Sequence, residues 1–122
     1  MNIASILSVS NLSVNYYQAG KPLCVLKDIS FFLNKGELLA LLGESGSGKS
    51  TCGKALMGLM PPSAKVKSGI LCLAENTVID LGAASIDWAP IRGKRIAMIY
   101  QDAMLALNPV RTIRDHFRET MC

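Results

Sequence analysis

The sequence contains few of the residues from which metal centres and disulfide-rich folds are built. Its 122 residues include one histidine and four cysteines, and no two cysteines have the C-x-x-C spacing. His116 has no second histidine beside it, so it does not indicate a metal site. We expect Cys24, Cys52, Cys72 and Cys122 to be free, reduced thiols, as is usual in the cytosol.

Long apolar runs and basic stripes are also missing. No run approaches the ~18 residues of a membrane-spanning helix, and residues 1–7 lack the positively charged start of a signal peptide. The net charge is +4, and apart from a cluster at residues 92–95 the lysines and arginines are scattered. A nucleic-acid interface needs a basic stripe with interleaved aromatic residues. We therefore expect a cytoplasmic chain with no transmembrane segment and no nucleic-acid partner.

One strong motif is present, because the residues from Gly43 onward read G-E-S-G-S-G-K-S-T and match the Walker A pattern G-x-x-x-x-G-K-S. The apolar residues 37–42 predict a buried strand before the motif, and residues 50–58 predict a helix after it. Glycines let backbone N–H groups converge on an anion, and the start of a helix adds positive potential. The motif therefore predicts a phosphate cradle formed by Gly43, Glu44, Ser45, Gly46, Ser47, Gly48, Lys49, Ser50 and Thr51.

Chemistry gives two of these side chains specific roles. The Lys49 ammonium is expected to reach the β- and γ-phosphates of a nucleotide, and the Ser50 hydroxyl to ligate Mg²⁺. Other P-loop classes are less consistent with the sequence. A GTPase needs an N-K-x-D motif, which is absent, and a small-molecule kinase needs an arginine-rich lid, for which only Arg111, Arg114 and Arg118 are candidates.

The N-terminal part of the chain reads as strands joined by turns. Residues 5–14 and 23–33 predict antiparallel strands, because apolar residues alternate along them and turn residues separate them at 18–22 and 34–36. Pro61 and Pro62 are expected to end the helix that follows the motif, since proline cannot continue a helix.

The C-terminal part predicts further strands and a last helix. Residues 68–73 and 77–81 read as short strands, and residues 95–100 as a second apolar strand. Between them Trp88 is expected to be a packing residue. Thr112 and Asp115 resemble a capping box, which begins a helix with an apolar face made by Ile113, Phe117 and Met121. No helix stop signal precedes Cys122, so the sequence looks truncated.

The order of these segments resembles the nucleotide-binding subunit of ABC transporters. The resemblance rests on N-L-S-V at residues 11–14, L-K-D-I-S-F at 26–31, the Walker A loop, M-G-L at 57–59 and I-A-M-I-Y-Q-D at 96–102. The tail, with L-N-P at 107–109, looks like the branch that imports dipeptides, oligopeptides and nickel, and R-E-T at 118–120 leans towards nickel.

The resemblance implies an α/β fold, namely a P-loop NTPase that forms the N-terminal half of an ABC nucleotide-binding domain with an antiparallel β-subdomain. It implies ATP and Mg²⁺ as cofactors. Tyr16 matches the aromatic residue that stacks on adenine, with Tyr17 as the fallback. Gln101 matches the Q-loop glutamine that contacts Mg²⁺ and the attacking water, and so joins Lys49 as a catalytic candidate. Ala103 and Ala106 stand where the family usually has a proline and a serine.

The family also implies partners, namely membrane subunits and a second nucleotide-binding subunit, and a location on the inner face of the cell membrane. Residues 1–122 are expected to be a partial domain, because they contain no Leu-Ser-Gly-Gly-Gln signature, no Walker B strand with its catalytic glutamate and no switch histidine. We therefore expect the chain to be part of an ATP-binding subunit that, in the full-length protein, energises uptake of peptides or nickel by ATP hydrolysis. The chain alone is expected not to turn over ATP. The alternatives are a non-hydrolysing remnant or another P-loop nucleotide-binding protein.

Overall fold

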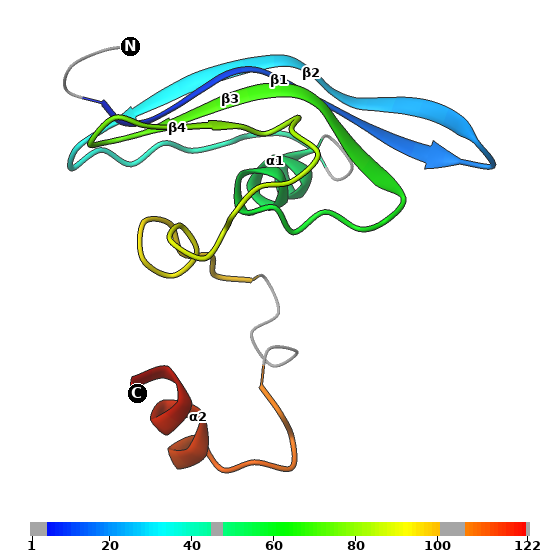
Figure 1. Cartoon of the computed structure of the whole chain (residues 1–122). Coiled ribbons are helices and arrows are strands. Elements are labelled where there is room, and N and C mark those ends of the chain that lie inside the picture. The colour runs from blue at the N-terminus through cyan, green and yellow to red at the C-terminus, as the bar shows by residue number, and fades with distance from the viewer. Residues whose placement is uncertain (1–4, 45–47, 101–106, 122) are drawn as a thin grey trace.

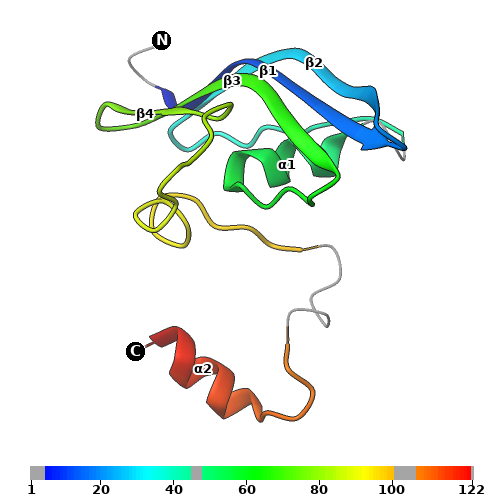
Figure 2. The ribbon, with the colours of Figure 1, turned by 45° about the vertical axis from the view of Figure 1, so that its right-hand side comes forward.

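The computed structural model describes residues 5–44, 48–100 and 107–121, and most of its regular structure is one antiparallel sheet. Its strands lie in the order β2-β1-β3-β4. Helix α1 lies against one face of this sheet, and helix α2 lies apart from it in both views (Figure 1, Figure 2). The elements are β1 (Ser5–Gln18), β2 (Lys21–Asn34), α1 (Lys49–Met57), β3 (Ala64–Leu73), β4 (Thr77–Asp80) and α2 (Ile113–Met121).

The predicted antiparallel pairing of the first two strands is confirmed, and each strand is longer than predicted. β1 and β2 are joined by a tight turn at Ala19 and Gly20, and a second turn follows β2 at residues 35–36. Both strands contain one bulge residue with a left-handed backbone, Asn11 (φ 53°) and Asp28 (φ 48°). Asparagine and aspartate adopt this conformation more readily than most residues.

The bulge at Asn11 explains why one strand can bury residues that do not alternate strictly. Val9, Leu12 and Val14 are all almost fully buried, although the spacing from Val9 to Leu12 is three residues. One extra residue in a strand returns the following side chains to the same face. Serines replace the lost ladder bonds, since the Asn11 N–H donates to Ser30 Oγ at 2.9 Å and the Asp28 N–H to Ser13 Oγ at 3.0 Å.

The core lies between the sheet and α1. It joins apolar side chains of β1 and β3 to Cys52 and Ala55 of α1, which are 4% and 1% exposed. Trp88 is half-buried against this cluster, which confirms the prediction that it is a packing residue. The buried members of the cluster are Val9, Leu12, Val14, Leu26, Cys52, Ala55, Leu71, Leu73, Leu81 and Ile91.

The two predicted apolar strands at residues 37–42 and 95–100 are wrong for this structure. Both segments are without regular strand structure, apart from one isolated bridge between Arg92 and Ile96. Leu38 and Leu42 are 96% and 93% exposed, and Ile99 is 94% exposed. A run that is apolar on both faces suits a strand inside a parallel sheet, which needs a neighbour on each side. None of the described strands pairs with either segment.

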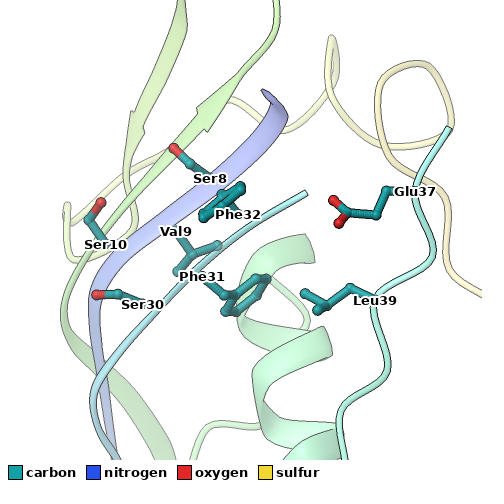
Figure 3. Close-up of a pocket in the computed structure, with 8 residues that line it drawn as sticks. All are labelled: Ser8, Val9, Ser10, Ser30, Phe31, Phe32, Glu37 and Leu39. Carbon is teal, nitrogen blue, oxygen red and sulfur yellow. The ribbon is translucent and has the colours of Figure 1, made fainter. Parts of the chain in front are cut away.

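A surface groove lies beside the first of these segments. It has a volume of about 510 Å³ and is open to one side. Figure 3 shows the Leu39 side chain pointing toward Phe31 across it, with part of α1 behind. The residues that line it are Ser8, Val9, Ser10, Ser30, Phe31, Phe32, Glu37 and Leu39.

Both predicted helices are present, and the difference from the prediction is the residue that ends α1. α1 ends at Met57, and Gly58 follows it with a left-handed backbone (φ 66°), so glycine and not the later Pro61 terminates the helix. The Asp115 N–H donates to Thr112 Oγ1 at 3.2 Å, which confirms the predicted start of α2. Ile113 and Phe117 on its apolar face are 71% and 62% exposed. No helix in the described part of the chain has the length and apolar character needed to cross a membrane.

Candidate functional site

The start of α1 is fixed by a glycine that no other residue can replace without strain. Gly48 is the N-cap of α1 and has φ 97° and ψ 7°, in the left-handed region. A Cβ atom built on it would lie 2.7 Å from Leu26 Cδ2 and 3.3 Å from the Val25 carbonyl oxygen. Gly48 therefore lets the backbone turn sharply while it packs directly against β2. The loop meets the helix here, as the Walker A motif predicts.

The first turn of α1 is open to an anion. In the described residues no side chain caps the helix at Gly48, and the first turn contains no acidic residue. The first N–H groups of a helix have no partner within it, and the helix dipole places positive potential at this end. Both features favour a phosphate group over a cation at this position.

The Lys49 side chain points back toward the first residue of the motif. Its ammonium group donates a hydrogen bond to the Gly43 carbonyl oxygen. This bond joins the beginning of the motif to the beginning of α1 and keeps the positive charge beside the helix N-terminus. Lys49, Ser50 and Glu44 are all exposed, so the lysine ammonium and the serine hydroxyl are accessible.

The two tyrosines of β1 are neighbours in the strand, where successive side chains point to opposite faces. The Tyr16 hydroxyl lies 3.4 Å from Thr51 Oγ1 in the first turn of α1, and Tyr16 is half-buried. Tyr17 is 39% exposed, and its backbone N–H donates to the Ser63 carbonyl at 2.7 Å. The structure therefore places Tyr16, the first choice from the sequence, beside the helix start.

Several predicted site residues lie outside the described part of the chain. These are Ser45, Gly46 and Ser47 of the loop, and Gln101 with Ala103 and Ala106 of the following segment. The other members of the predicted site lie in the described part of the chain, and they are Tyr16, Gly43, Glu44, Gly48, Lys49, Ser50 and Thr51.

Burial also affects a thiol in α1. Cys52 is 4% exposed, and desolvation by burial raises the pKa of its thiol above the ordinary value of 9.0. Because the thiolate is the reactive form, this cysteine is suited to packing and not to chemistry. Cys24, Cys52 and Cys72 are free, and Cys122 lies outside the described residues.

Sequence reasoning missed Arg92, which binds the other end of α1. Its guanidinium donates to the carbonyl oxygens of Met57 at 2.7 Å and Gly58 at 2.9 Å. The sequence contained a weak signal, the basic cluster at residues 92–95, but 34 residues separate Arg92 from Gly58 and nothing local pairs them.

Comparison with known proteins agrees with this geometry. The model of the ABC transporter family matches residues 26–121. The chain is 41% identical to the dipeptide transport ATP-binding protein DppD of Bacillus subtilis over 117 residues, which is 95% of this chain and 34% of that protein. It is 39% identical to DppD of Lactococcus lactis over 95% of this chain and 33% of that protein.

A further relative is the oligopeptide transport ATP-binding protein OppD of Lactococcus lactis. It is 40% identical over 121 residues, or 99% of this chain and 35% of that protein. The chain thus spans about a third of the length of these relatives. The family match covers well over half of the chain, and the phosphate-binding motif lies inside it. The chain belongs to the ABC transporter family, which has the P-loop NTPase fold.

Proposed function

We propose that this chain is the nucleotide-binding part of an ATP-binding subunit that energises peptide import. The observation that carries the proposal is the open start of α1, where Gly48 forms the turn and Lys49 supplies a positive charge. A polyphosphate is the ligand that such a helix start with an adjacent lysine favours.

The roles follow from the contacts. Lys49 exchanges its bond to the Gly43 carbonyl for one to the β- and γ-phosphates, and the N–H groups at the start of α1 hold phosphate oxygens. Tyr16 lies beside Thr51 and offers a ring on which adenine stacks. The remaining members of the predicted cradle, Glu44, Ser45, Gly46 and Ser47, complete the loop.

The residues present also fit Mg²⁺. The Ser50 hydroxyl is an oxygen ligand on the exposed side of the first turn, and a hard cation prefers such ligands. Gln101 is the second proposed ligand, since its amide oxygen is neutral and also able to orient water. When bound, the ion would neutralise negative charge on the phosphates.

The whole protein's activity is a further proposal, because the chain spans only about a third of its relatives. The complete subunit would hydrolyse ATP with a second nucleotide-binding subunit and drive membrane subunits from the inner face of the membrane. The relatives described above are named for dipeptide and oligopeptide transport, which supports peptides as cargo. Nickel stays a prediction from the sequence.

The 122 residues alone are proposed to bind ATP without turning it over. Phosphoryl transfer to water needs the cradle, the metal, a group that positions water and stabilisation of the transition-state charge. The printed sequence contains no Walker B glutamate and no signature motif. The second candidate, a remnant that binds nucleotide poorly, is favoured by the exposed, unpaired residues 37–42 that lead into the loop.

Calorimetric titration of ATP and Mg²⁺ into the folded chain and its Lys49→Ala variant tests the proposal. We expect the variant to lose about 2 kcal/mol or more of binding free energy, the upper range for a charge-assisted hydrogen bond. Lys35→Ala is the matched control, because it removes the same charge from the exposed turn after β2. Equal affinity of Lys49→Ala and Lys35→Ala would reject the role of Lys49. Phosphate release above that of Lys49→Ala would contradict the expected lack of turnover.

A further inference from the structure

The turn at residues 88–96 is a rigid element outside the candidate site. Backbone N–H groups of Arg92, Gly93 and Arg95 donate to the carbonyl oxygens of Trp88 (3.0 Å), Ile96 (2.8 Å) and Ile91 (2.9 Å), respectively. Ile91 is 4% exposed and anchors the turn in the core. The turn therefore holds two arginines, Arg92 and Arg95, at fixed positions.

Arg92 binds the C-terminal end of α1. Its Nε donates to the Met57 carbonyl at 2.7 Å and its Nη2 to the Gly58 carbonyl at 2.9 Å. The backbone N–H groups of Gly58 and Leu59 donate to the carbonyl oxygens of Ala55 and Lys54. Arg92 therefore binds two later carbonyls that these backbone bonds do not use. A cation at this end also interacts favourably with the helix dipole.

Trp88 completes this contact. A Cβ atom on Gly58 would lie 2.3 Å from the Trp88 ring, so the ring covers the helix end so closely that only glycine fits. The Arg92 guanidinium carbon lies 5.2 Å from the centre of the same ring, within cation–π distance. Gly58, Trp88 and Arg92 thus form one packed unit at the end of α1.

Arg95 of the same turn reaches a different element. Its Nη1 donates to Thr77 Oγ1 at 3.0 Å, and its Nη2 donates to the Ala74 carbonyl. Both acceptors lie at the turn between β3 and β4. The 88–96 turn therefore connects the C-terminal end of α1 to the sheet through two arginines.

We propose that Arg92 is a positioning residue for nucleotide binding, because it clamps the far end of the helix whose start holds the phosphates. This inference rests on the proposed function. α1 has nine residues, and isolated helices of that length are marginal in water. Its N-terminal N–H groups point at a ligand only while the helix is formed, so a contact at the C-terminus preorganises groups at the other end.

Hydrogen–deuterium exchange and ATP titration on the full 122-residue chain test this proposal with three variants. Arg92→Ala removes the clamp, and Arg92→Lys keeps the charge without the fork that reaches two carbonyls. Arg95→Ala is the matched control, because it removes an arginine of the same turn whose side chain donates to Thr77 and Ala74 at the turn between β3 and β4. Arg92 is exposed and is not one of the buried core residues.

We expect faster amide exchange within residues 50–57 in Arg92→Ala and unchanged exchange in β1 and β3, since local opening is measured separately from global unfolding. ATP affinity should fall about tenfold in Arg92→Ala, the loss expected from about one hydrogen bond, with partial rescue in Arg92→Lys. Arg95→Ala should leave both measurements near those of the unchanged chain.

Two results would overturn the proposal. One is unchanged exchange in residues 50–57 of Arg92→Ala, and the other is an affinity loss in Arg95→Ala as large as that in Arg92→Ala. A third outcome is that the unchanged chain binds no ATP while Arg92→Ala still shows faster exchange in α1. This outcome would refute the role in nucleotide binding, and Arg92 would still be shown to stabilise α1. In that case the Lys49→Ala titration also shows no difference, which identifies the proposed function as the part that failed.

Discussion

Strand β1 and residues 37–42 both contain leucines, yet these leucines have opposite environments. Leu12 of β1 is fully buried, whereas Leu38 is 96% exposed. β1 pairs with β2 across a two-residue turn and with β3 on its other side. Residues 37–42 have no such partner among the described strands. The comparison teaches that an apolar run becomes a strand only when a neighbouring strand can satisfy its backbone groups.

The test with the largest expected effect replaces one leucine from each region. Leu12→Ala should lower the free energy of unfolding by about 2–5 kcal/mol, because it leaves a cavity in the core. Leu38→Ala should change it by less than about 0.5 kcal/mol, as expected for an exposed side chain. Urea denaturation followed by circular dichroism measures both. A comparable loss in the two variants would mean that residues 37–42 are packed in solution.

The second test concerns two glycines that both have a left-handed backbone conformation. Gly48→Ala and Gly20→Ala each force a side chain into the left-handed region at φ 97° and φ 78°, at a cost of about 1–2 kcal/mol. Only Gly48 has neighbours at clashing distance, since no atom lies within 4 Å of a Cβ on Gly20. Gly48→Ala should therefore be the less stable variant and the only one with weaker ATP binding. Thermal melts measure the stability of both variants, and titrations measure their affinity for ATP. Equal values for the two variants would mean that the close contact of Gly48 with β2 does not matter for either property.

The third test separates the two faces of β1 at its end. Tyr16→Ala should weaken ATP binding about tenfold, since stacking on a base contributes about 1–3 kcal/mol. Inorganic triphosphate has no base, so its affinity should change little. Tyr17→Ala is the matched control from the other face. If Tyr17→Ala selectively weakens ATP instead, the adenine lies on the opposite side of the strand.

The smallest effect is expected from thiol chemistry. Because burial raises the pKa of Cys52, its thiol stays protonated in the folded chain at pH values where exposed thiols ionise. At mildly alkaline pH, alkylation of Cys52 should be slower than that of exposed Cys24 by on the order of tenfold, read by mass spectrometry. This protection should vanish in denaturant. Equal rates in the folded chain would mean that α1 opens readily.

The same pKa shift has a defined effect on stability. The folded pKa of Cys52 lies above the unfolded value of 9.0. The contribution of this thiol to stability is therefore fully present below pH 9.0 and is lost as the pH rises through the folded pKa.

Local patterns predicted the parts of the molecule that depend on local interactions. The turn at residues 18–22 sets the antiparallel hairpin, the turn at 34–36 ends β2, and the Walker A motif marked the start of α1 at Gly48. The bulges were not predictable, because they depend on serine hydroxyls of other strands, such as the bond from the Asn11 N–H to Ser30. Residues 37–42 were predicted from their own composition, which carries no information about whether a partner strand is present.

The exposed segment at residues 37–42 has a kinetic consequence. In the monomer, Leu38 and Leu42 of this segment are exposed to water. A contact between two copies of the chain would bury them. Pairing between two copies is second order in protein, so its initial rate falls fourfold when the concentration is halved. Dilution should therefore preserve the monomer far longer than cooling does, since hydrophobic attraction changes only gradually with temperature.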